Sequence, residues 1–176
     1  TVSVGNQPIS VAVDESLNRA FVVNSNTSVM TANGTVSVIN CATNAIASTI
    51  NVGIGPQGIT VNPATDRLFV ANSGSNTVST FIYVLPDAAP AVTNVNVGSA
   101  PVGIAFDADS TRVFVHNVGA NTVSVLDATP AVIDLIQTPV GTGLSGATVR
   151  ANAGDSRVYV AFKPNSMIVL DGDAAV

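Results

Sequence analysis

The sequence is poor in charge, and most of its few charges are negative. Only 10% of the 176 residues are charged, with six Lys plus Arg against eleven Asp plus Glu, and the net charge is −5. A nucleic-acid-binding surface needs clustered cations, so this composition excludes that function. No apolar run approaches the roughly 18 residues that a membrane-spanning helix needs, so no membrane span is predicted.

Cysteine, histidine and glutamate each occur once. The single Cys41 excludes an internal disulfide framework and any CxxC site. The single His116 leaves zinc without a ligand set and a general base without an evident partner. With Glu15 as the only glutamate, the Asp-x-Asp segments 107–109 and 171–173 come nearest to a calcium loop. We therefore expect no cofactor, with a weak calcium site as the alternative.

Apolar residues make up 47% of the chain, which is enough for a hydrophobic core. The apolar segments are short, rich in β-branched residues and bounded by Gly, Pro, Asn, Asp or Ser. This pattern predicts strands rather than helices. The chain starts at Thr1 without an initiator methionine or a signal peptide, so we expect a mature or excised piece.

Four segments of the chain share one pattern, and their starts are 43 to 48 residues apart. Each opens with Val-Gly, reaches an Arg-x-aromatic-Val segment after a polar turn, and continues into a third apolar run. The opening valines are Val4, Val52, Val97 and Val140, the arginines are Arg19, Arg67, Arg112 and Arg157, and three copies add Asn24, Asn72 or Asn117. A repeat of this length with about four short strands is typical of a β-propeller blade.

We therefore predict an all-β chain, a β-propeller of about four four-stranded antiparallel blades in a single domain over 1–176. The blades are expected at approximately 5–52, 53–97, 98–140 and 141–176. Residues 1–4 are expected to join the last blade as its fourth strand, because closing the ring hides an unpaired strand edge. The alternative is half of a larger ring or a fragment of a longer propeller.

Three features carry a resemblance to a known family: the Val-Gly-x-x-Pro openings, the strand ends Phe-Val-Val-Asn24, Phe-Val-Ala-Asn72 and Phe-Val-His-Asn117, and the Asn-Thr-Val-Ser segments. The pattern resembles the YVTN-type β-propeller repeats of surface-layer and secreted proteins. The fourth copy departs from it, with Leu144 in place of Pro and Ala161 in place of Asn. The resemblance implies an extracellular or cell-surface propeller, and related propellers include lactonases and quinoprotein-like enzymes.

The repeated arginines and asparagines are interpreted as structural. Each guanidinium is expected to tie its strand to a carboxylate or carbonyl of a neighbouring blade, and a ligand-binding ring of arginines is the alternative. The candidate partners are Asp14, Asp66, Asp107, Asp127, Asp155 and Asp171. Asn24, Asn72 and Asn117 at the strand ends, and Asn76 and Asn121 four residues further on, are expected in hairpin turns, because Asn tolerates left-handed backbone; a sugar- or calcium-binding rim is the alternative.

Propellers present binding residues on the loops at one end of the ring. We predict a non-enzymatic extracellular or cell-surface module for binding, adhesion or assembly, with a protein or glycan as partner. The expected partner-binding residues are Asn6, Gln7, Asn26, Asn33, Gln57 and Ser99. One alternative is a lactonase- or hydrolase-like enzyme with carboxylates at the channel mouth. Another is a self-assembling building block, a homo-oligomer that pairs through blade edges.

Overall fold

The described part of the chain consists of strands joined by turns and loops. The computed structural model describes residues 1–26, 32–127, 132–137, 148–152, 154–162 and 166–171. These residues form fifteen strands in four antiparallel sheets, which confirms the predicted all-β fold class. Among them, the structure has no helix with the length and apolar character needed to cross a membrane.

Strands that follow one another along the chain are neighbours within each sheet. The first sheet holds β1 (Pro8–Asp14), β2 (Arg19–Asn24), β3 (Asn33–Asn40) and β4 (Ala45–Ile54). The second holds β5 (Pro56–Asn62), β6 (Arg67–Asn72), β7 (Thr77–Ile82) and β8 (Thr93–Asn96). The third holds β9 (Pro101–Asp107), β10 (Arg112–Asn117), β11 (Thr122–Leu126) and β12 (Val132–Gln137). The fourth holds β13 (Thr148–Asn152), β14 (Arg157–Phe162) and β15 (Ser166–Asp171).

The repeated arginine marks the same turn in every sheet. It is the first residue of the second strand, and the residue before it has a left-handed φ of 49° to 55°. Asn18 and Asp66 adopt this conformation readily, because their short polar side chains tolerate it. Thr111 and Ser156 take the same conformation in the other two copies. The turn between the first two strands is therefore set by backbone geometry as well as by sequence.

Each sheet packs face to face on the next through its own apolar cluster. The three clusters join Phe21 and Val38 to Leu68, Phe69 and Val78 to Val113, and Phe114 and Val125 to Val158. The aromatic residue of one sheet and the residue directly after the repeated arginine of the next sheet recur in all three clusters. The hydrophobic core of this chain is thus divided into three equivalent layers between successive sheets.

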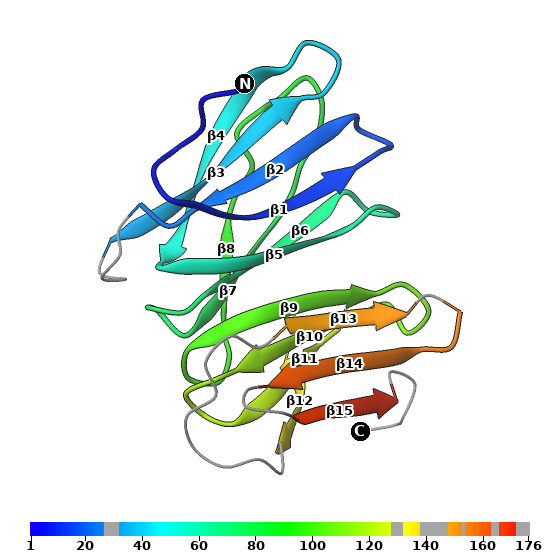
Figure 1. Cartoon of the computed structure of the whole chain (residues 1–176). Coiled ribbons are helices and arrows are strands. Elements are labelled where there is room, and N and C mark those ends of the chain that lie inside the picture. Colours follow the sequence, from blue (N-terminus) through cyan, green and yellow to red (C-terminus); the bar gives the residue numbers. More distant parts are fainter. Residues whose placement is uncertain (27–31, 128–131, 138–147, 153, 163–165, 172–176) are drawn as a thin grey trace.

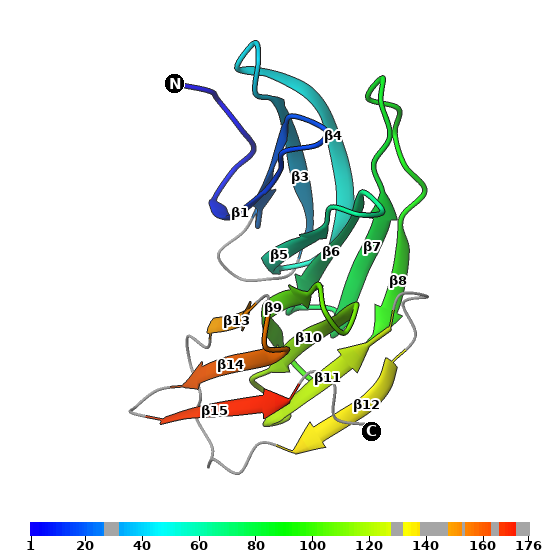
Figure 2. The same ribbon diagram turned by 90° about the vertical axis from the view of Figure 1, so that its right-hand side faces the viewer.

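The first strands of the four sheets, β1, β5, β9 and β13, lie nearest to one another, and we call them the inner strands (Figure 1). The remaining strands fan outward from them (Figure 2). Gly58 allows β5 and β9 to approach closely, because a Cβ there would lie 2.6 Å from the carbonyl oxygen of Val102. The amide of Phe106 in β9 donates a hydrogen bond to Thr60 Oγ1 in β5 (3.2 Å).

The structure does not show the predicted closure of a four-bladed ring. Residues 1–4 lie outside any strand, and the fourth sheet consists of β13, β14 and β15 in the part of the chain that is described. The amide of Gly5 bonds to Ser37 Oγ (3.3 Å) and holds this segment against the first sheet. The first and fourth sheets stand at opposite ends of the molecule (Figure 1). The four sheets form an arc, which agrees with the alternative of half a ring or a fragment.

Candidate functional site

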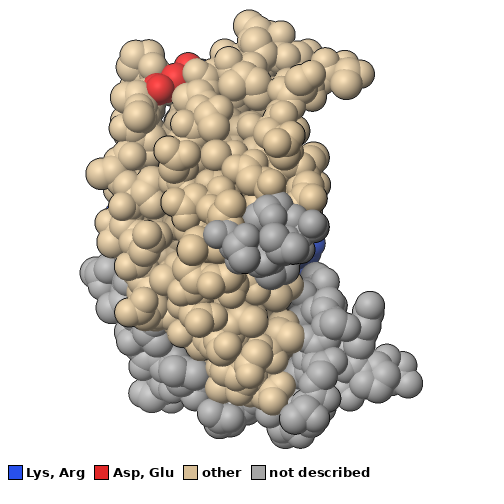
Figure 3. Space-filling view, turned by 90° about the vertical axis from the view of Figure 1, so that its left-hand side faces the viewer, with Lys and Arg blue, Asp and Glu red and all other residues tan. Residues whose placement is uncertain are grey.

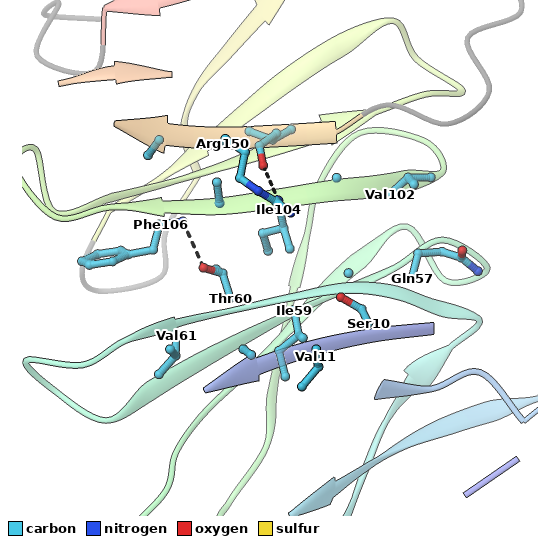
Figure 4. A pocket seen from close by; sticks show the side chains of 16 residues that line it. Ser10, Val11, Gln57, Ile59, Thr60, Val61, Val102, Ile104, Phe106 and Arg150 are labelled. Carbon is cyan, nitrogen blue, oxygen red and sulfur yellow. Dashed lines mark hydrogen bonds between the residues drawn. The ribbon is translucent and has the colours of Figure 1, made fainter. Parts of the chain in front are cut away.

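The inner strands line a groove of about 440 Å³ along the concave side of the arc. Its wall is formed by residues 10–12 of β1, 57–61 of β5, 102–106 of β9 and 149–151 of β13. Figure 4 shows these side chains on four neighbouring strands, with Arg150 of β13 at one side and Ser10 and Val11 of β1 at the other. All four sheets contribute residues to this groove.

The groove wall combines aliphatic groups with a few polar ones. Hydroxyl and amide groups come from Ser10, Thr60 and Gln57. Among the described lining residues the only charged side chain is that of Arg150. Its guanidinium is exposed, and Nη1 donates to the carbonyl oxygen of Val149 (2.9 Å). Such a surface supplies hydrogen bonds, apolar contact and one fixed positive charge.

Sequence reasoning did not select Arg150, although a signal was present. Arg150 lies seven residues before the repeated Arg157, and the residues seven before the other repeated arginines are Ala12, Thr60 and Ala105. All four of these positions line the groove. The fourth copy therefore places a cation where the other copies place small side chains. Counting back from the repeated arginine would have identified it.

The Val-Gly-x-x-Pro loops lead into the inner strands and are held to neighbouring hairpins by backbone hydrogen bonds. At the first sheet, Ser25 N donates to Gln7 O (3.0 Å) and Asn26 N to Asn6 O (3.1 Å). The same pair of backbone bonds recurs from Ser73 to Gly55 and Gly74 to Ile54, and from Val118 to Ala100 and Gly119 to Ser99. Gln7, Gly55 and Ala100 take a left-handed φ of 51° to 57°. The loops are therefore built alike in three sheets.

The structure gathers four of the six predicted partner-binding residues at one place. Asn6 and Gln7 are exposed, and their carbonyl oxygens accept from the amides of Asn26 and Ser25. Asn26 Nδ2 donates to the carbonyl oxygen of Asn33 (3.2 Å). Gln57 lies at the start of β5 in the groove wall. Ser99 is exposed in the corresponding loop before β9. The predicted partner-binding residues therefore lie in a loop cluster at the first sheet, in the groove wall and in the loop before β9.

The repeated asparagines brace the strand junctions instead of forming turns. Asn24, Asn72 and Asn117 are the last residues of β2, β6 and β10, and each is fully buried. Asn72 Nδ2 donates to Thr77 Oγ1 (3.1 Å) and Ser79 Oγ (2.8 Å), and the other two copies repeat these bonds. The left-handed residues of these hairpins are Asn76 and Asn121, four residues further on. Burial beside a hydroxyl pair therefore overrides the turn preference of Asn.

Arg19 links the first two sheets through a carboxylate that was not among the predicted partners. Its Nε and Nη2 donate to Asp87 Oδ1 (3.1 Å) and Oδ2 (3.3 Å), and Asp87 follows β7. Tyr83 Oη donates to Asp87 Oδ1 (2.8 Å) and lies 3.2 Å from Ser48 Oγ. The hydrogen bond from Tyr83, with the bond and charge of Arg19, lowers the pKa of Asp87. Burial raises the pKa of Tyr83 above its usual value of 10.

The other three repeated arginines have different surroundings. Arg67 Nη1 donates weakly to Thr80 Oγ1 (3.5 Å), and Arg112 begins β10 opposite Asp107. Arg157 lies 3.8 Å from Asp155 in an exposed ion pair. Among the described residues, Arg19 thus forms an inter-sheet bond to a carboxylate, whereas Arg67 and Arg157 contact residues of their own sheet.

Three of the described aspartates, Asp14, Asp107 and Asp109, accept hydrogen bonds from nearby turns. Asp14 accepts bonds from the amides of Ser16 and Leu17, and Asp107 accepts bonds from Ser110. Asp109 Oδ2 accepts the amide of Gly154 (2.6 Å) and so connects the third and fourth sheets. In the described ranges, no three His, Cys, Asp or Glu side chains are grouped as metal ligands. Segment 172–173 lies outside the described residues.

His116 is fully buried in β10, two residues after Phe114. Burial lowers the pKa of its imidazole to about 4. At neutral pH the side chain is therefore uncharged and enclosed by protein. The groove takes no contribution from it.

Comparison with known proteins identifies the fold. No family model and no curated protein matches the chain. Among solved structures it is similar to a functionally unknown protein from Desulfotomaculum acetoxidans (TM-score 0.69, 19% identity, covering 88% of this chain and 48% of that one). It is also similar to Kuenenia stuttgartiensis hydrazine synthase (TM-score 0.76, 14% identity, covering 96% of this chain and 59% of that one). A third similar structure is the β-propeller domain of Myceliophteria thermophila Cps50 (Swd1) (TM-score 0.69, 11% identity, covering 93% of this chain and 53% of that one).

The fold is thus that of a β-propeller, and each sheet is a blade. The identities are below 20%, so the likeness concerns the fold alone. This chain spans about half the length of each of these three chains. Its four blades therefore match a part of those structures.

Proposed function

We propose that this propeller is a non-enzymatic binding module at the cell surface or outside the cell, and that it holds a protein or glycan chain in the inner groove. The groove carries the proposal, because it is built by all four blades and presents hydroxyl, amide and apolar groups along one line. Pockets of this make-up bind through shape and a few placed polar groups. The location rests on the resemblance of the repeats to secreted and surface-layer propellers.

Arg150 indicates the chemistry of the partner. It is the only charged residue among the described lining residues, and a guanidinium pairs best with carboxylates. The side of the molecule seen in Figure 3 is formed almost entirely by residues without charge in its described part. A long-range field contributes little on such a surface, so a single Arg–carboxylate contact has a large share in recognition. The proposed partner is an extended chain that carries a carboxylate.

The test is a titration of the ¹⁵N-labelled chain with two acidic probes, oligogalacturonate and a glutamate-containing peptide, and with a neutral maltooligosaccharide. We expect one acidic probe to shift the amide signals of Ser10, Thr60 and Ile104, which line the groove. The Arg150→Gln variant should weaken that binding about tenfold, since a charge-assisted hydrogen bond contributes about 1.5–3 kcal/mol.

Arg157→Gln is the matched control, because Arg157 is exposed on the same blade but does not line the groove. It should bind the probe like the wild type. Binding of neither acidic probe, or equal losses in the two variants, would contradict the proposal.

A further inference from the structure

The two end blades expose apolar faces that the repeat buries elsewhere. On the first blade, Ile9, Val11 and Val13 alternate along β1 and are all exposed. On the fourth blade, Met167 and Val169 alternate along β15 and are exposed as well. Contiguous exposed apolar residues of this kind mark interaction surfaces. We call these two surfaces the leading face (residues 9, 11 and 13) and the trailing face (residues 167 and 169).

The leading face has a buried counterpart in each of the other blades. Val11 lies eight residues before the repeated arginine, and Ile59, Ile104 and Val149 hold that position in the next three blades. In every blade this residue lies opposite the residue three positions after the repeated arginine, so the pairing register of the first two strands is the same in all four blades. Val11 is 61% exposed, whereas Ile59, Ile104 and Val149 are 7%, 4% and 1% exposed. The difference arises because a preceding blade covers the other three.

The trailing face shows the same relationship in the opposite direction. Val169 lies opposite Tyr159, as Val38 lies opposite Phe21 and Val125 opposite Phe114. Val38 and Val125 are 0% and 1% exposed, because the following blade covers them, whereas Val169 is 50% exposed. The trailing face is thus the kind of surface that packs on a leading face three times within this chain.

We propose that a second copy of this chain covers both faces, with the trailing face of each copy packed on the leading face of the other. Two copies then form one closed ring of eight blades. The leading and trailing faces have the chemistry that already meets at the three internal blade contacts. This chain covers 48%, 59% and 53% of the three similar solved chains, so a second copy would supply a comparable length of propeller. Such an interface joins unlike surfaces and closes after two copies.

The strand edges support the same arrangement. In the second and third blades the amides of Gly53 and Gly98 bond to Ser79 and Ser124, and the residues before Gly53 belong to β4, the outermost strand of the preceding blade. Gly5 makes the equivalent bond to Ser37. Residues 1–4 therefore stand where the outermost strand of a preceding blade ends. In the two-copy ring they lie beside β15 of the other copy and add a strand to its blade.

The test uses two charged variants, Val11→Asp on the leading face and Val169→Asp on the trailing face. One chain has a mass of 17.7 kDa, and sedimentation equilibrium of the wild-type chain should give twice that mass. Each variant alone should be monomeric, since every contact it forms would enclose a carboxylate and weaken association by at least about 100-fold. An equimolar mixture should associate more strongly than either variant alone, because one of its two contacts joins the unaltered trailing face of Val11→Asp to the unaltered leading face of Val169→Asp, while the other contact encloses both carboxylates.

Val84→Asp is the matched control, because this valine is 51% exposed but lies between β7 and β8, away from both faces. It should dimerise like the wild type. A monomeric wild type at about 100 μM would overturn the proposal. A filament would overturn it as well. A dimer that persists in one of the two variants would also overturn it, because such a dimer would join two leading faces or two trailing faces. The outcome is independent of groove binding, because each variant is measured without a probe.

Discussion

Gly53 packs directly against the side-chain amide of Asn72. A Cβ at Gly53 would lie 2.6 Å from Asn72 Cγ. The equivalent distance is 2.6 Å from Gly98 to Asn117 Cγ and 2.7 Å from Gly5 to Asn24 Cγ. The glycine of each Val-Gly opening and the asparagine at the end of the second strand are therefore one packing unit. The glycine amide and the asparagine side chain also share one acceptor, Ser79 Oγ in the second blade.

Replacing Gly53 by alanine should destabilise the chain by about 2 kcal/mol, because an added methyl group in a filled site forces the backbone or the amide to move. The measurement is the free energy of unfolding in urea. Asn51→Ala, at an exposed position of the same strand, is the control and should change it by less than about 0.5 kcal/mol. Equal effects of the two substitutions would show that the close contact with Asn72 has no energetic weight.

The hydroxyl of Ser79 and the amide of Asn72 should be energetically coupled. Ser79 Oγ accepts from Gly53 N and Asn72 Nδ2 and donates to Asn94 Oδ1 (2.7 Å). Asn72→Ala and Ser79→Ala should each cost about 2 kcal/mol, since each leaves buried polar groups without partners. The double variant should lose clearly less than the sum of the two. Strict additivity in the double-mutant cycle would mean that the bond contributes nothing of its own.

The repeated pattern allowed the strands to be predicted, because short β-branched runs and turn residues recur at fixed distances. The role of Asn72 was not predictable in the same way, since the local preference of Asn is for turns and its burial depends on Gly53, far along the chain. Asp87 escaped prediction because it stands in the connection between β7 and β8, which spans 83–92 and is longer than the equivalent connections at 41–44 and 127–131. Ring closure depends on how far each blade turns, which the pattern does not encode.

The Asp87 carboxylate should make the chain sensitive to acid. Its pKa is lowered in the folded state, so its contribution to stability is present above the unfolded value of about 4 and is lost as the pH falls through the folded pKa. Asp87→Asn should therefore flatten the decline of unfolding free energy below about pH 4 relative to the wild type. Parallel pH profiles for the two proteins, from urea unfolding, would contradict this role.

Removing the phenol of Tyr83 tests the same contact from the other side. Tyr83→Phe keeps the edge-to-face packing on Phe21, whose ring centroid is 5.3 Å away, but removes the bond to Asp87. We expect a loss of about 1 kcal/mol at neutral pH. The acid sensitivity should also decrease, because the hydrogen bond from Tyr83 is the main cause of the lowered pKa of Asp87. A variant as stable as the wild type would show that packing alone holds this corner.

His116 should titrate far below the usual histidine range. Its folded pKa of about 4 lies below the unfolded value of about 6.5, so its contribution is complete above about pH 6.5 and is lost as the pH falls towards 4. The predicted loss is up to about 3 kcal/mol. Because His116 is the only histidine, its ring signal in a ¹H NMR titration is unambiguous. A midpoint near 6.5 would show that the imidazole is accessible to water.

The central claim is that successive blades pack face to face in chain order, and inter-blade NOEs test it most directly. Contacts are predicted between the rings of Phe21 and Tyr83, between Thr60 and the amide of Phe106, and between Asp109 and the amide of Gly154. These three pairs join the first blade to the second, the second to the third and the third to the fourth. Observation of all three supports the propeller arc. Intact sheets without these cross-peaks would show that the blades are not stacked in this way. The first strands of the four blades would then not line a common groove.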